Sequence, residues 1–443
     1  MTSRNQNLPG RPPGFVYQQA RRGTLRTNGP LVLQCEGVPL PKLAEKFDTP
    51  LYVYSTATIS ERHQAFDRAF RDVPHTICYS VKANSNLSIL RLLARKGCGF
   101  DVVSGGELER ILIAERRAAK KVVFSGVGKT REEITAALKA GILLFNIESE
   151  SELRTLAEYA GRLRATAPIA LRVNPDVAAE THPYISTGLH KHKFGVPIRE
   201  ARALYAKASG VRYLRIRGVS VHIGSQITDA GPFGEAMSRV GELVRELRHD
   251  GHKIDYVDAG GGLGIPYDQP NASSFPDQVA AYAAALVTPL RELDIHLLLE
   301  PGRSIVGPAG VLLTSIVYKK SNNGKKFLIV DAAMNDLIRP ALYGAFHEII
   351  PVRLQGEQPA KTETTDIVGP VCETGDFFAR DRTLPLVEEG DLLAILDAGA
   401  YGMVLASNYN SRPRPAEVIV SGKSVRLLRR REKISDLLRC EEL

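Results

Sequence analysis

From about residue 50 to residue 305, short apolar runs alternate with longer segments in which apolar residues recur at helical spacing. The runs are rich in β-branched side chains, which favour strands, and they comprise residues 76–81, 99–103, 121–125, 143–147, 169–173, 218–222, 254–258 and 295–299. The segment 232–249 shows the helical pattern, with apolar residues at Phe233, Met237, Val240, Leu243, Val244 and Leu247. This regular alternation predicts parallel strands joined by crossover helices.

Eight such repeats favour a closed (β/α)8 barrel over residues 51–305, and a doubly wound open sheet is the alternative architecture. Polar side chains suited to chemistry stand at the carboxyl ends of the runs, at Lys82, Ser104, Ser125, Glu148, Asn174, His222, Gly260 and Glu300. Because the carboxyl ends of barrel strands form one mouth, these residues are expected to converge there. Their placement therefore favours the barrel.

The pattern changes after residue 305, where strand-like runs follow one another without helical segments between them. These runs comprise residues 311–317, 326–330, 391–396 and 417–420. They predict a mostly β second domain, barrel-like or sandwich-like, built from residues 306–443 and completed by residues 31–50. Residues 1–30 are dominated by Pro, Gly, Arg, Asn and Gln and are predicted to form a flexible basic tail.

The composition is that of a water-soluble globular protein of 443 residues, with 44% hydrophobic and 24% charged residues. No apolar stretch reaches the roughly 18 residues of a membrane span, and no secretory signal is recognisable. Five cysteines at irregular spacing predict neither a zinc site nor a disulfide framework. A protein of the reducing cytoplasm, with no metal and no membrane partner, is therefore expected.

The net charge of +9 lies partly at the two ends of the chain. The first 35 residues carry five arginines and no acid, and a run of three arginines stands at 429–431. A nucleic-acid interface would need basic residues on a folded platform with interleaved aromatics, so a solvated surface is favoured and no nucleic-acid partner is expected. An organelle transit peptide is the alternative interpretation of the arginine-rich start.

Several single residues suggest cofactor chemistry. Lys82 directly follows the first apolar run, and partial burial at a barrel mouth would favour the neutral amine that forms Schiff bases, with a solvated lysine as the alternative. The ring of His222 could lie flat against a cofactor or fill a structural position, and Ser225 could donate to a phosphate. Cys372 stands in a polar, turn-rich segment, which favours an exposed, proton-donating thiol over a buried packing residue.

A glycine-rich segment at 260–264 follows the seventh run. Its successive N–H groups could cradle a phosphate, with a plain tight turn as the alternative. Phosphate sites in barrels commonly form after the seventh and eighth strands, whereas a dinucleotide fingerprint would open a helix early in the chain. After the eighth run, Glu300 could keep a pyridine nitrogen protonated, and Arg303 could bind a phosphate or a carboxylate.

The chain thus carries a set of short motifs: Tyr-Ser-Val-Lys-Ala-Asn (79–84), Gly-Phe-Asp-Val-Val-Ser-Gly-Gly-Glu-Leu (99–108), His-Lys-Phe-Gly (192–195), His-Ile-Gly-Ser-Gln (222–226), Gly-Gly-Gly-Leu-Gly (260–264), Glu-Pro-Gly-Arg (300–303) and Cys-Glu-Thr-Gly-Asp (372–376). With this set, the chain from about residue 40 to residue 425 resembles the diaminopimelate decarboxylases, within the alanine-racemase-like fold group of pyridoxal-phosphate enzymes. One departure is His192, where the family often has serine.

The resemblance implies a pyridoxal 5'-phosphate cofactor and a homodimer whose subunits share their active sites. Lys82 would bind the cofactor as a Schiff base, His222 would stack on its ring, and Glu300 would hold its pyridine nitrogen. Cys372 of the partner subunit would protonate the product carbon. The residues implied around the phosphate are Ser225, Gly261, Gly262 and Arg303.

The resemblance also implies a substrate with a second amino-acid end, whose carboxylate would need an arginine. Arg339 and Tyr343 are the residues expected there, with Glu373 taking the distal ammonium group. Arg303 and Tyr401 would contact the substrate as well as the cofactor.

The implied reaction is the decarboxylation of meso-2,6-diaminopimelate to L-lysine and carbon dioxide. One alternative is a decarboxylase of ornithine, lysine or a carboxylated polyamine, although the ornithine enzymes usually have aspartate where this chain has Glu373. Alanine racemases usually place arginine at the pyridine nitrogen, where this chain has Glu300. A non-catalytic pyridoxal-phosphate carrier or regulatory binder is the second alternative, and such a protein would need neither Cys372 nor Arg339.

Overall fold

A computed structural model of the chain describes residues 14–19, 30–177, 193–269, 272–354 and 361–443. The chain divides into two compact units. The barrel unit comprises Arg62–Ile265 and Ser273–Ser304. The β unit comprises Met1–Glu61, Pro266–Ala272 and Ile305–Leu443. Within the described residues, no helix is both long enough and apolar enough to cross a membrane.

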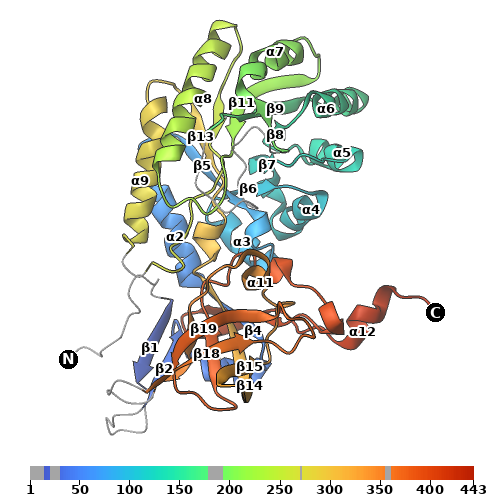
Figure 1. Cartoon of the computed structure of the whole chain (residues 1–443). Coiled ribbons are helices and arrows are strands. Elements are labelled where there is room, and N and C mark those ends of the chain that lie inside the picture. The colour runs from blue at the N-terminus through green and yellow to red at the C-terminus, as the bar shows by residue number, and fades with distance from the viewer. Residues whose placement is uncertain (1–13, 20–29, 178–192, 270–271, 355–360) are drawn as a thin grey trace. The chain divides into compact units, whose positions relative to one another are not determined.

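Eight parallel strands close into a barrel in the barrel unit (Figure 1). In spatial order they are β5 (His75–Ser80), β6 (Gly99–Val102), β7 (Val122–Phe124), β8 (Leu144–Ile147), β9 (Ala167–Asn174), β11 (Leu214–Val221), β12 (Tyr256–Asp258) and β13 (His296–Leu299). The sheet returns on itself because β13 pairs with β5 and β8 pairs with β9. The closed barrel is therefore confirmed, and the open-sheet alternative is wrong. The short β10 (Val196–Pro197) adds a parallel pairing to β9.

Helices connect these strands on the outside of the barrel, as Figure 1 shows for α4 to α8. They are α3 (Leu87–Arg95), α4 (Gly105–Ala114), α5 (Arg131–Ala140), α6 (Glu150–Leu163), α7 (Ile198–Ser209), α8 (Gly231–His249) and α9 (Phe275–Val287), and α2 (Thr56–Ala69) precedes the first strand. Ser104 and Ser149 accept hydrogen bonds from backbone N–H groups in the first turns of α4 and α6. These helices begin within a few residues of the strand ends. The polar side chains in the short connections therefore lie at the mouth of the barrel.

The interior of the barrel is filled by side chains that point inward from several strands. A buried cluster there comprises Cys78, Val123, Leu144, Ala170 and Leu298. Such a layered interior is a packed core and not a pore, so chemistry is confined to the carboxyl ends of the strands.

The β unit is built on two sheets. The first contains β1 (Phe15–Gln19), β2 (Leu31–Cys35), β3 (Val38–Pro39) and β17 (Arg353–Leu354). The second contains β4 (Leu51–Ser55), β14 (Gly310–Asn322), β15 (Lys325–Val330), β16 (Ile349–Pro351), β18 (Thr362–Val368), β19 (Phe377–Pro385), β20 (Leu392–Ile395), β21 (Ala416–Ser421) and β22 (Ser424–Arg429). The mostly β second domain is thus confirmed, and the four strand runs expected after residue 305 correspond to β14, β15, β20 and β21.

Short helices lie between these strands or, in the case of α12, after the last of them, whereas no helical segments were expected between the strand runs after residue 305. They are α1 (Leu40–Phe47), α10 (Arg303–Val306), α11 (Arg339–Tyr343) and α12 (Ile434–Leu437), and each of α10, α11 and α12 is too short to show helical periodicity in the sequence.

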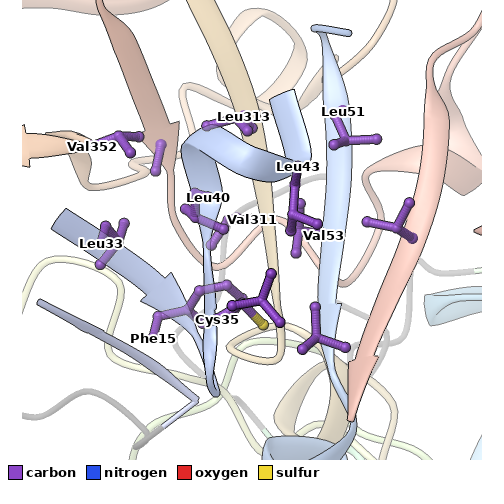
Figure 2. Close-up of a cluster of buried hydrophobic side chains, with 14 of the residues drawn as sticks. Phe15, Leu33, Cys35, Leu40, Leu43, Leu51, Val53, Val311, Leu313 and Val352 are labelled. Atoms are coloured by element: carbon purple, nitrogen blue, oxygen red, sulfur yellow. The ribbon is translucent and has the colours of Figure 1, made fainter. Parts of the chain in front are cut away.

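Two segments differ from the expected domain limits. The boundary expected at residue 50 assigns Leu51–Ser55 to the barrel, but this strand pairs with β14 and β21 in the β unit. Part of the expected tail, Phe15–Gln19, forms β1 and pairs with β2. Both segments lie against a buried apolar cluster, shown in Figure 2, that includes Phe15, Leu33, Val53 and Val311. Burial of their apolar side chains accounts for both assignments.

Candidate active site

Lys82 lies at the mouth of the barrel, in the short 3-10 turn η1 (Val81–Ala83) that follows β5. Its Nζ atom is 2.9 Å from Oδ2 of Asp101, a fully buried carboxylate on β6. The Lys82 side chain is 37% exposed, so its amine is held by a buried acid and still remains accessible from the mouth. Ser80 also donates to Oδ2 of Asp101, at 2.9 Å, which fixes the carboxylate that holds the lysine.

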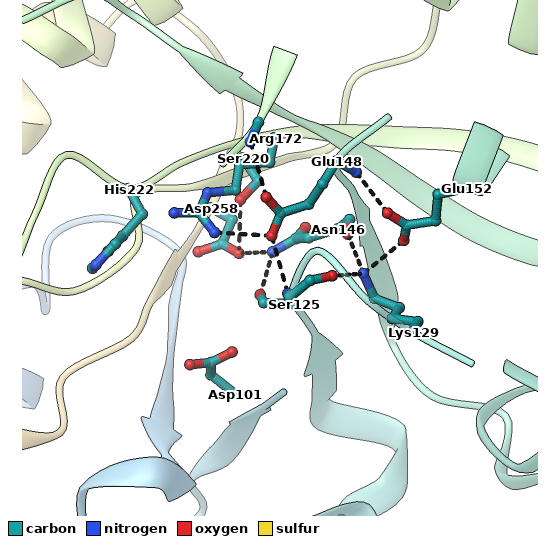
Figure 3. Close-up of polar contacts among 12 residues, drawn as sticks. Asp101, Ser125, Lys129, Asn146, Glu148, Glu152, Arg172, Ser220, His222 and Asp258 are labelled. Carbon is teal, nitrogen blue, oxygen red and sulfur yellow. Dashed lines mark hydrogen bonds and ion pairs between the residues drawn. The ribbon is translucent and has the colours of Figure 1, made fainter. Parts of the chain in front are cut away.

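Three buried carboxyl groups gather at this mouth, from Asp101, Asp258 and Glu300. Burial, followed by the charges of Asp101 and Asp258, raises the pKa of Glu300 well above its usual range. Burial also raises the pKa of Asp258, although this carboxylate accepts hydrogen bonds from Nδ2 of Asn146 at 2.6 Å and from the Gly260 N–H at 3.0 Å. The arrangement favours a protonated Glu300 beside the hydrogen-bonded carboxyl group of Asp258 (Figure 3 shows Asp258, Asn146 and Asp101).

His222 directly follows β11 and is held in one orientation by the backbone. Its Nδ1 atom accepts a hydrogen bond from the Gly261 N–H at 3.2 Å, so the neutral ring carries its proton on Nε2. Burial lowers the pKa of His222 well below its usual range, and the positive charges of Arg172 and Lys82 lower it further. His222 therefore presents a neutral, oriented aromatic ring, as a stacking role requires.

At Gly261 and Gly262, the segment 260–264 can adopt its observed path only with glycine. Gly262 has φ +113°, and a Cβ atom there would lie 2.5 Å from the carbonyl oxygen of Gly224. A Cβ atom on Gly261 would lie 2.2 Å from the carbonyl oxygen of Glu300. The glycine run therefore packs directly against Gly224. The next residue is Ser225, and its Oγ accepts a hydrogen bond from Arg303 at 3.1 Å. A hydroxyl, a guanidinium group and a glycine-lined backbone are thus brought together, as a phosphate cradle needs.

A second buried network lies beside this one, at the ends of β7, β8 and β9 (Figure 3). Oε1 of Glu148 accepts from Arg172 at 2.9 Å and from the Gly126 N–H at 3.0 Å, and its Oε2 accepts from the Gly195 N–H at 2.9 Å. Lys129 and Glu152 form a further ion pair, 2.7 Å long, with both side chains almost fully buried. Glu148 therefore links its own loop to the loops of Gly126 and Gly195 at the mouth. It also holds the Arg172 guanidinium, whose positive charge lowers the pKa of His222.

Sequence patterns alone missed several of these residues, namely Asp101, Asn146, Arg172 and Asp258. Each is a charged or amide side chain within, or at the end of, a mostly apolar strand run. Because a lone polar residue in a buried strand needs a partner in the interior, this interruption was the signal that could have identified them.

The remaining predicted site residues belong to the β unit. Cys372 is exposed, and its backbone N–H donates to Oδ1 of Asn410 at 2.9 Å; Glu373 is exposed beside it. Tyr401 is partly buried and has φ +55°, a left-handed conformation that is costly for a non-glycine residue and is enriched at functional sites. Arg339 and Tyr343 both lie on α11. His192 lies outside the described residues.

The groups at the barrel mouth fit pyridoxal 5'-phosphate by their chemistry. A primary amine matches its aldehyde, a buried acid that favours its proton matches the pyridine nitrogen, and a neutral imidazole matches its ring. The glycine run, with no room for a Cβ atom at Gly261, matches the phosphate together with Ser225 and Arg303.

Comparisons with known proteins agree with this fit. A family model described as "Pyridoxal-dependent decarboxylase, pyridoxal binding domain" matches residues 56–307. The diaminopimelate decarboxylase of Vibrio cholerae serotype O1 is 51% identical over 413 residues, which are 93% of this chain and 97% of that protein. The crystal structure of diaminopimelate decarboxylase from Helicobacter pylori, complexed with L-lysine, has a TM-score of 0.85 and 42% identity and covers 90% of this chain and 98% of its own. The enzyme from M. jannaschii, in co-complex with L-lysine, has a TM-score of 0.87 and 42% identity, with coverages of 93% and 96%.

Proposed function

The chain belongs to the diaminopimelate decarboxylases, and from this membership we propose how its residues divide the work of the reaction. The protein is a pyridoxal-phosphate-dependent lyase that converts meso-2,6-diaminopimelate to L-lysine and carbon dioxide, the final step of lysine biosynthesis. The observation that carries the proposed roles is the Lys82 amine, held 2.9 Å from the buried Asp101 carboxylate in the same barrel unit as Glu300.

When bound, pyridoxal phosphate accepts the electron pair that carbon dioxide leaves behind at the substrate carbon. Lys82 would supply the amine that holds the cofactor, and the Asp101 carboxylate, 2.9 Å away, would hold and orient this amine. Glu300 would hold the pyridine nitrogen and would supply the proton that makes the ring a stronger electron acceptor. His222 would cover the ring, and Ser225, Arg303 and the glycine run would bind the phosphate.

The test of the substrate is carbon dioxide release from meso-diaminopimelate, with ornithine, lysine and arginine in parallel, with and without added pyridoxal phosphate. We expect release from diaminopimelate alone and only with the cofactor. Arg339→Ala is expected to raise the KM for diaminopimelate by about tenfold or more, because a charge-assisted hydrogen bond to the distal carboxylate is lost. Equal release from ornithine or lysine would contradict the assigned substrate.

We further propose that Cys372 of the partner subunit donates the proton that replaces the lost carboxylate, so that the working enzyme is a homodimer. The exposure of the thiol supports this role, since a buried cysteine could not enter a second subunit's site. A cytoplasmic location is also proposed, because all five cysteines are free thiols.

Cys372→Ala is expected to lower turnover by about 100-fold while leaving cofactor binding intact, because a positioned proton donor contributes a factor of this order. Cys440→Ala is the matched control, since Cys440 is the other exposed cysteine and should be dispensable. Carbon dioxide release and cofactor absorbance measure the two effects. Unchanged turnover in Cys372→Ala would remove this thiol from the reaction.

Mixing Cys372→Ala with the inactive Lys82→Ala variant tests whether the site is shared. Random exchange of subunits would rebuild one complete site in each mixed dimer, so activity should recover to about a quarter of the wild-type value. Absence of any recovery, with subunit exchange verified by differently tagged chains, would place both residues in the same subunit's site.

A further inference from the structure

Arg339, the residue proposed to bind the distal carboxylate, is buried and held on two sides within the β unit. It opens α11 and is only 5% exposed. Its guanidinium carbon lies 4.7 Å from the centre of the Tyr267 ring, and its terminal NH1 nitrogen is 2.8 Å from Nε2 of His347. His347 is fully buried and meets the same tyrosine edge to face, with ring centres 5.4 Å apart.

The hydrogen-bonding roles in this contact are determined by chemistry. Arginine has only donors, so Nε2 of His347 must be the acceptor. The ring proton then lies on Nδ1, which is 2.7 Å from the carbonyl oxygen of Leu396 and donates to it. His347 is therefore a neutral histidine in one defined tautomer, with both ring nitrogens used.

The backbone around His347 is anchored as well. Its carbonyl oxygen accepts a hydrogen bond from Arg382 at 3.1 Å. The next residue, Glu348, accepts from the Leu396 N–H at 2.8 Å, and β16 then continues the pairing with β20. The backbone that carries the His347 imidazole is thus fixed by the pairing of β16 with β20, so the ring can hold Arg339 in a constant position.

We propose that His347 is a positioning residue that orients the Arg339 guanidinium for the carboxylate end of the substrate. The neutral imidazole accepts from NH1 of Arg339 and so restrains this N–H group. The hydrogen bond to His347 and the contact with Tyr267 set the plane of the guanidinium, and a guanidinium held in a fixed plane suits bidentate binding of a carboxylate. This inference rests on the proposed role of Arg339 and adds to it the residue that sets its geometry.

Two ligands isolate the contribution of this carboxylate. The reaction removes one carboxylate of diaminopimelate and leaves the other in L-lysine, whereas 1,5-diaminopentane has the same chain and amines but no carboxylate. The ratio of their inhibition constants in the holoenzyme therefore reports how well the carboxylate end is bound. Changes that merely loosen the fold would weaken both ligands together.

His347→Asn and His347→Gln separate positioning from packing. The amide of glutamine reaches the place of Nε2 and can accept from Arg339, whereas the shorter asparagine amide reaches only the place of Nδ1. We expect His347→Asn to weaken L-lysine by about tenfold with 1,5-diaminopentane unchanged, and to raise the KM for diaminopimelate with little change in kcat. His347→Gln should recover most of the preference for lysine. If His347→Asn does not give folded holoenzyme, His347→Met removes the acceptor at similar volume and serves the same comparison.

Arg339→Ala provides the reference that keeps the two proposals apart. Loss of the lysine preference in Arg339→Ala but not in His347→Asn or His347→Met would overturn the positioning role alone. Retention of the preference in Arg339→Ala would overturn the role of Arg339 itself, and with it the inference. Equal weakening of both ligands in the histidine variants would show that His347 only supports the fold, which also contradicts the proposal.

Discussion

Lys82→Ala is expected to abolish decarboxylation and to remove the visible absorbance that a lysine-bound pyridoxal group gives. In its proposed role the Lys82 amine is the nucleophile that holds the cofactor, and alanine offers no replacement, so we expect turnover to fall by at least about 1,000-fold. The variant should still fold, because the Lys82 side chain is 37% exposed and carries little of the packing. Carbon dioxide release and the absorbance spectrum of the purified protein measure the two losses.

Lys121→Ala is the matched control for this change. Lys121 is an exposed lysine of the same unit whose Nζ donates to the Gly97 carbonyl oxygen at 3.0 Å, outside the group of residues at the mouth. Its loss should leave the spectrum and turnover unchanged. Partial rescue of Lys82→Ala by added methylamine would support the loss of the amine as the cause. A Lys82→Ala variant with normal turnover would refute the assignment.

Glu300→Gln is expected to lower kcat by about 100-fold while retaining the cofactor and the KM for diaminopimelate. Glutamine preserves the shape and can form a hydrogen bond with the pyridine nitrogen, but it can neither transfer a proton nor balance the resulting charge. Electrostatic contributions of this kind are worth factors of about 100 to 1,000. Glu300→Asp, which keeps the acid at a shorter reach, should lose less, and rates at saturating substrate measure the difference. A Glu300→Gln variant with wild-type kcat would show that the pyridine nitrogen needs no acid in this enzyme.

The raised pKa of Glu300 also has a consequence for the stability of the cofactor-free protein. Below the unfolded-state pKa, about 4.3, the acid is protonated in both states. Above it, the unfolded chain ionises while the folded protein keeps the proton, so Glu300 lowers stability as the pH rises towards its folded pKa. Glu300→Gln should therefore make the melting temperature of the cofactor-free protein fall less between pH 5 and pH 8. A pH dependence identical to that of the wild type would contradict burial of an ionisable Glu300.

Some site residues could be predicted from the sequence because their positions depend only on the neighbouring residues in the chain. Lys82, His222 and Glu300 each stand directly after an apolar run, and a parallel barrel brings all such positions to one mouth. The glycine run was recognisable because backbone at positive φ and without room for a Cβ atom requires glycine. Their individual roles in the reaction remain predictions that the variants above test.

Other features could not be read from local order. Strand β4 was assigned to the barrel because it lies next to it in sequence, but it pairs with β14 and β21, which follow more than 200 residues later. Its five buried residues would suit either environment, since a fully buried strand shows no alternation that identifies its partners. The neighbours of a central strand are decided by tertiary packing.

By itself, the sequence determined the (β/α)8 barrel, the β unit, the cofactor class and the family, because periodicity, glycine positions and short motifs are properties of neighbouring residues. Only the tertiary structure decided the electrostatic states at the site. The protonation of Glu300, which follows β13, depends on burial beside Asp101 on β6 and Asp258 on β12. The tautomer of His347 depends on Arg339 and Leu396, which contact its two ring nitrogens. Both are set by desolvation and by through-space partners, and these quantities exist only once the chain has folded.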